Sequence, residues 1–414
     1  KMKLFRREGY LKRIRNFYKE TDIIKVITGV RRCGKSSLLE VIKEELLESG
    51  IDEKDIISID LDSRKYRKIK TADELELVIE NLIEPDNNIK YLFIDEIQNV
   101  KDFEEVVNAF RTEGDFSIFI TGSNTYLLSG ELVTKLTGRY IELEMYPLNF
   151  SEYIEMKKFF SKKVSSNLQE ELHNYLLEGG FPRTIFIDEF SDKRMYVTSI
   201  IKEIFEKDIK QRAAIRNTEV FDIVRNFVIN NYGATFSIAS IHRALVGEGR
   251  SVKRDTISKY IDELVKSKIL YCCDRFDMKS KKMLSGEKKY YLADISFYFS
   301  TNTDNRINYG PALENLVYIY AKSKGYSVSV GRIGKLECDF ILRSANSVDM
   351  EYFYVQIAYT INESKETEDR EFRPLEQIRD NYTKYVFTTD YLLQKRNGIR
   401  HENLLEFMKK DKDF

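Results

Sequence analysis

The first third of the chain alternates short apolar runs with amphipathic stretches. Apolar runs of strand length lie at residues 23–28, 56–61, 91–94, 117–121 and 140–143. Between them, apolar residues recur with helical spacing at residues 36–48, 73–83 and 103–113. This alternation is typical of an α/β domain built on a doubly wound, largely parallel sheet. We therefore expect such a domain over residues 1–155.

The pattern then changes, which predicts further domains. Residues 156–217 are mostly helical in period, and we expect a helical lid there. Residues 218–300 carry three helical patterns followed by two strand-like runs, an order that resembles a winged helix. In residues 301–414 a helix precedes several short strands and a charged helix near residues 370–381, which predicts a separate α/β domain.

Composition limits the class of protein. Of the 414 residues, 42% are hydrophobic and 32% charged, which suits packed domains rather than a disordered chain. The 67 basic and 67 acidic residues cancel, so nucleic-acid binding would need a local patch. No apolar run approaches the roughly 20 residues that span a bilayer. Four cysteines without a CxxC pair favour a reducing compartment. We expect a cytoplasmic protein with no membrane partner.

Residues 29–36 read Gly-Val-Arg-Arg-Cys-Gly-Lys-Ser, which matches the phosphate-loop motif G-x-x-x-x-G-K-[ST] at every defined position. Glycines let such a loop wrap a polyphosphate, so that backbone N–H groups and the helix N-terminus face the anion. Lys35 would reach the β- and γ-oxygens, and the Ser36 hydroxyl would ligate Mg²⁺. An ordinary glycine turn is the alternative. With ATP and Mg²⁺ as cofactors, the expected binding residues are Gly29, Arg32, Cys33, Gly34, Lys35, Ser36 and Ser37.

Polar residues follow two further strand patterns. One pattern leads into Asp95 and Glu96. Asp95 can hold the Mg²⁺ shell, and Glu96 is placed to orient and deprotonate an attacking water. Another leads to Ser123 and Asn124, of which Ser123 is the first candidate to touch the γ-phosphate or this water. The alternatives are solvated acids at a strand end and plain turn chemistry.

Several short motifs together resemble one family. They are the phosphate loop, Asp-Glu-Ile-Gln at 95–98, Thr-Gly-Ser-Asn at 121–124, Thr-Gly-Arg at 137–139 and Tyr-Pro-Leu at 146–148. The family is that of prokaryotic AAA-type ATPases fused to a C-terminal domain of unknown function, and the resemblance covers nearly the whole chain. It implies ATP hydrolysis to ADP in a homo-oligomer, with a hexameric ring favoured.

In such rings one subunit supplies an arginine to its neighbour's γ-phosphate. The resemblance points to Arg139 for this role, and the alternative is an ion pair with Glu142 or Glu144. Arg183 is a weaker candidate for a second arginine that acts within its own subunit. The residues expected to carry catalysis are Lys35, Glu96, Ser123 and Arg139.

The winged-helix segment is locally basic. Between residues 243 and 289 there are thirteen Lys and Arg against seven Asp and Glu. DNA is therefore a candidate partner, and the alternative is a lid or protein contact. The wing tip would be Lys-Ser-Lys-Lys at 279–282. The residues expected to contact phosphates are Arg250, Lys253, Arg254 and Lys259.

The C-terminal segment resembles the PD-(D/E)xK nuclease fold, which implies a restriction-endonuclease-like domain. Glu314 on a helix and Asp339 on a strand match two expected metal ligands. Gln356 stands where a carboxylate is expected and Ala358 replaces the lysine, which argues against cleavage. Structural carboxylates at element ends are the alternative.

These features predict an AAA-type ATPase that couples Mg²⁺-dependent turnover to conformational change in an oligomer, with DNA as a candidate target. A nucleotide-gated DNA- or protein-binding module with slow hydrolysis is the main alternative. An ATP-dependent nuclease is a third.

Overall fold

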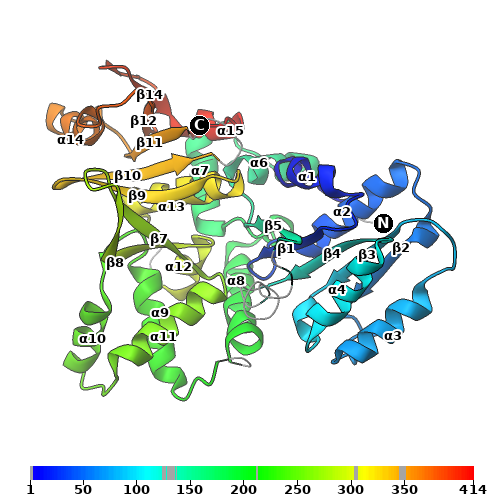
Figure 1. Ribbon diagram of the computed structural model, residues 1–414. Helices are drawn as coiled ribbons and strands as arrows, with labels where there is room; N and C mark the ends of the chain where they lie inside the picture. The colour runs from blue at the N-terminus through cyan, green and yellow to red at the C-terminus, as the bar shows by residue number, and fades with distance from the viewer. Residues whose placement is uncertain are drawn as a thin grey trace. The chain divides into compact units, whose positions relative to one another are not determined.

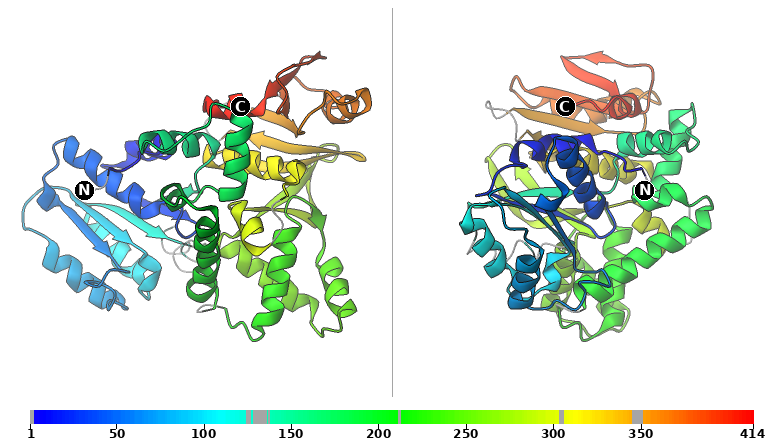
Figure 2. Two further views of the ribbon diagram at one scale, coloured as in Figure 1. Left: turned by 180° about the vertical axis from the view of Figure 1, so that it is seen from behind. Right: turned by 90° about the vertical axis from the view of Figure 1, so that its right-hand side faces the viewer.

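The computed structural model describes residues 3–123, 127, 136, 138–210, 213–302, 306–344 and 351–414. The chain divides into two compact units (Figures 1 and 2). The first unit comprises residues 1–145 with 266–268, and the second comprises residues 146–265 with 269–414. None of the described helices is long and apolar enough to cross a bilayer.

The first unit is built on a parallel sheet, as the alternating pattern predicted. The described strands follow the order β2-β3-β4-β1-β5, and every neighbouring pair is parallel. Their bounds are β1 Ile24–Gly29, β2 Ile56–Asp60, β3 Lys90–Asp95, β4 Phe116–Gly122 and β5 Tyr140–Met145. Strands β1 and β4 are buried along their whole length, because helices cover both faces of a parallel sheet.

The helices of the first unit lie on both faces of this sheet (Figure 1). Helices α3 and α4 pack on one face, where Leu75, Ile79 and Phe110 join the apolar core of the strands. Helix α3 begins with a capping box between Thr71 and Glu74. The bounds are α1 Glu8–Ile14, η1 Arg15–Phe17, α2 Lys35–Glu48, η2 Glu53–Asp55, α3 Ala72–Leu82, η3 Ile97–Asn99 and α4 Phe103–Glu113.

The second unit opens with helices and continues as a mixed sheet with further helices. The helical segments before residue 270 are α6 Phe150–Phe159, α7 Leu168–Glu178, η5 Pro182–Phe186, α8 Phe190–Ile204, η6 Phe205–Ile209, α9 Thr218–Asn230, α10 Ile238–Gly247 and α11 Arg254–Lys266. The later helices are α12 Ser296–Thr301, α13 Tyr309–Ser323, α14 Lys365–Glu376 and α15 Leu404–Lys409. Helix α14 starts before the expected residue 370 because the Ser364 side chain caps it by accepting the Thr367 N–H at 3.1 Å.

The strands of the second unit form one sheet across the boundary expected at residue 300. In the described part of the chain its order is β13-β14-β12-β11-β10-β9-β7-β8-β6. The link is the parallel pairing of β7 with β9. The bounds are β6 Thr235–Phe236, β7 Leu270–Asp277, β8 Lys282–Leu292, β9 Ser327–Ile333, β10 Leu336–Arg343, β11 Tyr352–Ile357, β12 Thr383–Thr388, β13 Lys395–Arg396 and β14 Ile399–Asn403.

Candidate nucleotide site

The phosphate loop, the two acids and Ser123 lie at one edge of the parallel sheet. The loop follows β1, Asp95 ends β3 with Glu96 next to it, and Ser123 follows β4. Strands β3, β4 and β1 are parallel neighbours, so their carboxyl ends meet at this edge. The structure therefore brings Lys35, Asp95, Glu96 and Ser123 together.

Two glycines shape the loop. Gly29 has φ +147°, and a Cβ atom there would lie 2.3 Å from the Met145 carbonyl oxygen on the neighbouring strand β5. Gly34 has φ +110° and precedes α2, which begins at Lys35 without a side-chain cap. Backbone N–H groups at an uncapped helix start are available to an anion. The loop therefore has the backbone form that phosphate binding requires.

The Lys35 side chain folds back across the phosphate loop. Its ammonium donates hydrogen bonds to the carbonyl oxygens of Gly29 at 3.0 Å and Val30 at 3.3 Å, and its side chain is buried. Ser36 and Ser37 are exposed in the first turn of α2. A hard cation such as Mg²⁺ prefers oxygen ligands, so the accessible Ser36 hydroxyl fits the role expected of it.

The middle of the loop is fixed by contacts that the sequence did not indicate. The Cys33 thiol is buried and lies 3.7 Å from the Met145 carbonyl oxygen, and the Cys33 N–H donates to the Val30 carbonyl oxygen at 3.3 Å. The Cys33 carbonyl oxygen accepts a hydrogen bond of 3.0 Å from the Arg7 guanidinium. Arg7 precedes α1, and no spacing in the sequence connects it with the loop. Arg32 is exposed, with φ +69°.

The two acids have different surroundings. The Thr121 hydroxyl donates to Asp95 Oδ1 and accepts the Glu96 N–H at 3.0 Å, so Thr121 holds both residues in place. Glu96 has φ +57°, which turns its carboxylate out of the strand direction. Burial raises the pKa of Glu96, while the cations of Lys35 and Arg31 act in the opposite direction. A carboxylate with a raised pKa suits a general base.

Ser123 is buried beneath two side chains. Its hydroxyl oxygen accepts hydrogen bonds from Gln98 Nε2 at 3.3 Å and from the Arg31 guanidinium at 3.4 Å. The same Gln98 nitrogen donates to Glu96 Oε2. Ser123 thus belongs to a network with Glu96. Asn124, the second candidate for this position, lies outside the described residues.

Comparisons with known proteins place this geometry in a family. Residues 21–154 match the family model described as an AAA domain, and residues 169–305 match a domain of unknown function, DUF8612. An uncharacterized protein of Haemophilus influenzae is 36% identical over 94% of both chains. An uncharacterized protein of Methanocaldococcus jannaschii is 31% identical over 86% of this chain and 79% of that protein. This chain belongs to their family.

The AAA-domain match covers most of the first unit, and we call the parallel sheet of this unit the AAA sheet. A Walker-type ATPase of Pyrococcus abyssi aligns with 72% of this chain and 95% of its own, at 16% identity and a TM-score of 0.48.

Arg139 lies at the edge of the AAA sheet formed by the amino-terminal ends of the strands, opposite the phosphate loop. Its carbonyl oxygen accepts the Ile24 N–H at 2.9 Å, where β1 starts, whereas the phosphate loop leaves β1 at the other end. Six strand residues at about 3.3 Å each separate the two edges by roughly 20 Å. The Arg139 side chain is exposed and forms no ion pair with a described residue, Glu142 and Glu144 included. Arg139 is therefore not part of its own chain's site. Arg183 is exposed in the second unit.

The second unit contains the other carboxylate group that the sequence singled out. Glu314 of α13 is partly buried, and its carboxylate accepts a hydrogen bond of 3.0 Å from the Tyr291 hydroxyl. The Lys289 ammonium of β8 lies 3.4 Å from Glu314 Oε2 and 2.6 Å from Glu337 Oε1. Lys289 is itself buried, so the protein supplies its own cation between these acids.

The other expected nuclease positions are also occupied by internal contacts. Asp339 accepts the Ile357 N–H at 2.8 Å, and Gln356 binds the Asp339 N–H at 3.3 Å and the Glu371 carboxylate at 3.0 Å. Burial raises the pKa of Asp339 well above its usual range, and Glu314 adds to this effect. The described residues contain no cluster of three metal-ligating side chains. Glu314, Asp339 and Gln356 therefore do not form the kind of site that would hold the metal ion of a nuclease.

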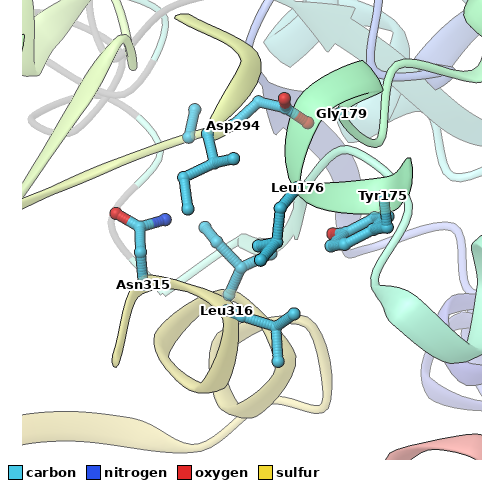
Figure 3. A pocket seen from close by; sticks show the side chains of 9 residues that line it. Tyr175, Leu176, Gly179, Asp294, Asn315 and Leu316 are labelled. Atoms are coloured by element: carbon cyan, nitrogen blue, oxygen red, sulfur yellow. The ribbon is translucent and has the colours of Figure 1, made fainter. Parts of the chain in front are cut away.

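A small cavity in the second unit is structural. Asp294 accepts the Gly180 N–H at 2.6 Å and the Ser296 N–H at 2.9 Å. Asn315 exchanges two hydrogen bonds with the Leu292 backbone. The cavity volume of about 10 Å³ accommodates no more than one water. The side chains labelled in Figure 3 are Tyr175, Leu176, Asp294, Asn315 and Leu316, with Gly179 beside them.

Proposed function

We propose that this protein binds ATP with Mg²⁺ and hydrolyses the γ-phosphate bond at the edge of the AAA sheet. The observation that carries the proposal is the convergence of a glycine-shaped phosphate loop, Asp95 and the partly buried Glu96 at neighbouring strand ends. A phosphate loop followed by acids on an adjacent strand is the arrangement that phosphoryl transfer to water uses.

Each residue then has a defined role. Lys35 would exchange its two carbonyl partners for β- and γ-phosphate oxygens, and α2 would present its first N–H groups to the phosphates. Ser36 and Asp95 would hold Mg²⁺, which when bound neutralises charge on the phosphate oxygens. Thr121 orients Asp95. Glu96 would accept a proton from the attacking water. Ser123, which shares the Gln98 amide with Glu96, would help to position the Glu96 carboxylate.

We further propose that Arg139 acts on the ATP of a neighbouring subunit. The side chain is exposed at the sheet edge away from its own phosphate loop, so contact with a γ-phosphate requires a second copy of the chain. Arginines supplied in this way raise phosphoryl-transfer rates by roughly 10³–10⁵-fold. The proposal links catalysis to oligomerisation and allows turnover to drive rearrangement between subunits.

Steady-state ATP hydrolysis measured against protein concentration tests both proposals, with Lys35→Ala as the blank. We expect the specific rate to rise with concentration and Arg139→Ala to lower the plateau rate at least 100-fold. Arg67→Ala, which removes another exposed arginine of the same unit, is the matched control and should behave as the wild type. A rate for Arg139→Ala equal to that of Arg67→Ala would refute the trans role. Wild-type turnover no higher than the blank would favour a nucleotide-gated binding module.

A second candidate function, DNA binding, has its own supporting observation. In the second unit, α9, β6, α10, α11, β7 and β8 follow one another in the order of a winged helix. The exposed face of α11 is of mixed sign, because Arg254 and Lys259 share it with Asp255 and Asp262. Arg250 is paired with Glu219 at 2.8 Å. These residues favour a lid or protein contact over phosphate binding by α11.

The β7–β8 turn, which corresponds to the wing, differs from α11 because its exposed charged side chains are cations. Asp277 of β7 and Arg332 of β9 are opposite each other in the parallel pairing of these strands. The Met278 N–H donates to the Arg332 carbonyl oxygen at 2.9 Å. The β7–β8 and β9–β10 turns therefore lie side by side (Figure 1). We call the exposed cations of these two turns the basic edge. Asp277 is engaged by the backbone N–H of Ser280 at 3.1 Å. We propose that the basic edge contacts DNA phosphates. Its residues are Lys279, Lys281, Lys282, Arg332 and Lys335.

Fluorescence anisotropy with a labelled duplex checks this proposal at several salt concentrations. The double variant Lys281→Ala/Lys335→Ala should weaken binding at low salt about tenfold or more and reduce the slope of log affinity against log salt by about 2. Lys253→Ala/Lys259→Ala removes two exposed cations at and beside α11 and serves as the control. Equal loss in the two double variants would show that general positive charge, rather than the basic edge, carries the binding.

A further inference from the structure

A strongly basic segment joins β2 to α3 in the first unit. Residues 63–72, which we call the basic loop, contain five Lys and Arg and no Asp or Glu. All five cations are exposed, and none forms an ion pair with a described side chain. In a chain of zero net charge, this is a marked local concentration of positive charge. The cations are Arg64, Lys65, Arg67, Lys68 and Lys70.

The backbone of the basic loop is fixed by the fold. Ile69 belongs to the apolar core of the first unit, and Tyr66 packs against that core. The Ser63 carbonyl oxygen accepts the N–H groups of Tyr66 at 3.2 Å and Arg67 at 2.8 Å. The loop therefore presents its cations from a backbone that is already ordered, which lowers the entropic cost of binding a partner.

The acids that flank the basic loop are engaged by other groups. Asp62 Oδ1 accepts a hydrogen bond of 2.9 Å from the Asn99 amide. Glu74 Oε2 accepts the backbone N–H groups of Lys70 at 2.7 Å and Thr71 at 3.2 Å. Neither carboxylate forms an ion pair with a cation of the loop. The positive charge of the loop is therefore available to an external anion.

The chemistry of the loop favours one class of partner. Its single aromatic residue, Tyr66, packs against the core, whereas proteins that hold single strands stack bases on accessible aromatic rings. None of its apolar side chains is fully exposed, whereas protein–protein interfaces have an apolar centre and are poor in lysine. Exposed lysines and arginines without aromatic or apolar neighbours suit the phosphate backbone of a duplex.

Both ends of the basic loop are tied to the segment that carries the acids of the nucleotide site. The Leu61 N–H donates to the Asp95 carbonyl oxygen at 3.2 Å. The Lys70 carbonyl oxygen accepts the Lys101 N–H at 2.9 Å. Strand β2 also pairs with β3 in parallel, so the loop leaves the sheet at the edge where Asp95 and Glu96 lie. A partner that orders the loop therefore also acts on residues 95–101.

We infer that the basic loop binds the phosphate backbone of duplex DNA and that this binding raises ATP turnover at the adjacent site. The surface is distinct from the basic edge of the second unit. The effect on turnover rests on the proposed ATPase function, whereas the binding itself does not.

Fluorescence anisotropy of a labelled duplex at several salt concentrations tests the binding. The double variant Lys65→Ala/Lys68→Ala should weaken binding at low salt about tenfold or more and reduce the slope of log affinity against log salt by about 2. Arg67, whose replacement is the control for hydrolysis without DNA, is left intact. Lys12→Ala/Lys19→Ala removes two other exposed lysines of the same unit and is the matched control.

Three results of this experiment would overturn the inference. One is an affinity of Lys65→Ala/Lys68→Ala equal to that of Lys12→Ala/Lys19→Ala, even where the basic-edge variant has lost binding. Another is a wild type that does not bind the duplex, which would also refute the basic edge. The third is a wild type that binds phosphatidylserine vesicles through the loop lysines but not the duplex, because the partner would then be a membrane surface.

The ratio of ATP turnover with duplex to turnover without it tests the coupling. We expect a ratio of about five or more in the wild type and in Lys12→Ala/Lys19→Ala, and a ratio near one in Lys65→Ala/Lys68→Ala. A wild-type ratio near one would overturn the coupling while leaving the proposed ATPase intact. Wild-type turnover no higher than the Lys35→Ala blank would overturn the proposed function and the coupling, and the anisotropy measurement would still decide the binding.

Discussion

Glu96→Gln is expected to bind ATP but to hydrolyse it very slowly, so that the nucleotide stays trapped as ATP. Gln has the size of Glu and keeps an oxygen for hydrogen bonding, but it cannot accept a proton from water. Removal of a general base lowers rates by roughly 10²–10⁴-fold. The phosphate loop, which holds the nucleotide, is unchanged in this variant. We therefore expect the turnover number to fall by at least 100-fold while the affinity for ATP stays within about threefold of wild type.

Single-turnover hydrolysis and filter binding of labelled ATP separate these two effects. Lys35→Ala should lose binding itself, because it removes the ammonium that lies across the loop. Glu80→Gln, an exposed acid on α3, is the matched control and should match the wild type in both assays. Full turnover by Glu96→Gln would show that another group activates the water, and the assignment of Glu96 as general base would be withdrawn.

Lys289→Met is expected to destabilise the second unit. The Lys289 ammonium is buried between Glu314 and Glu337, at 3.4 Å and 2.6 Å. Removing one partner of a buried ion pair leaves the other charge uncompensated, which costs roughly 3 kcal/mol or more in the free energy of unfolding. Hydrogen exchange of the β8 and α13 amides measures this loss within the unit. Lys288→Met changes the adjacent lysine of β8, which forms no ion pair with a described side chain, and should have a small effect.

The pH dependence of this loss identifies its cause. Burial raises the pKa of both Glu314 and Asp339 in the folded chain, so the folded state binds more protons than the unfolded state. Stability from these groups is therefore present at low pH and falls as pH rises through their raised pKa values. Lys289→Met raises these values further, so its deficit should be largest at neutral pH and shrink toward pH values of about 4.5.

The double variant Lys289→Met/Glu314→Gln removes both a cation and an acid. It should recover part of the lost stability, because the uncompensated charge at Glu314 is gone. A deficit that is independent of pH, with no recovery in the double variant, would attribute the effect to packing instead.

Patterns among neighbouring residues were sufficient to predict the local features of this protein. The alternation of apolar runs with helical periods indicates the parallel sheet of the first unit, because strand and helix periods are properties of neighbouring residues. The phosphate-loop motif locates the nucleotide site for the same reason. Gly29 and Gly34 adopt the positive φ angles that the motif requires of glycine. The acids Asp95 and Glu96 were found because they follow a strand within the same motif pattern.

Contacts between residues that are far apart in the chain follow from the fold. The parallel pairing of β5 with β1 places Arg139 beside the start of β1, away from its own phosphate loop. Packing also brings Arg31 and Gln98 to Glu96, and it places Lys289 of β8 beside Glu314 of α13. These contacts depend on strand order and long-range pairing, which no short stretch of sequence encodes. The sequence therefore indicated the chemistry of the site, and the fold decided which charges surround it.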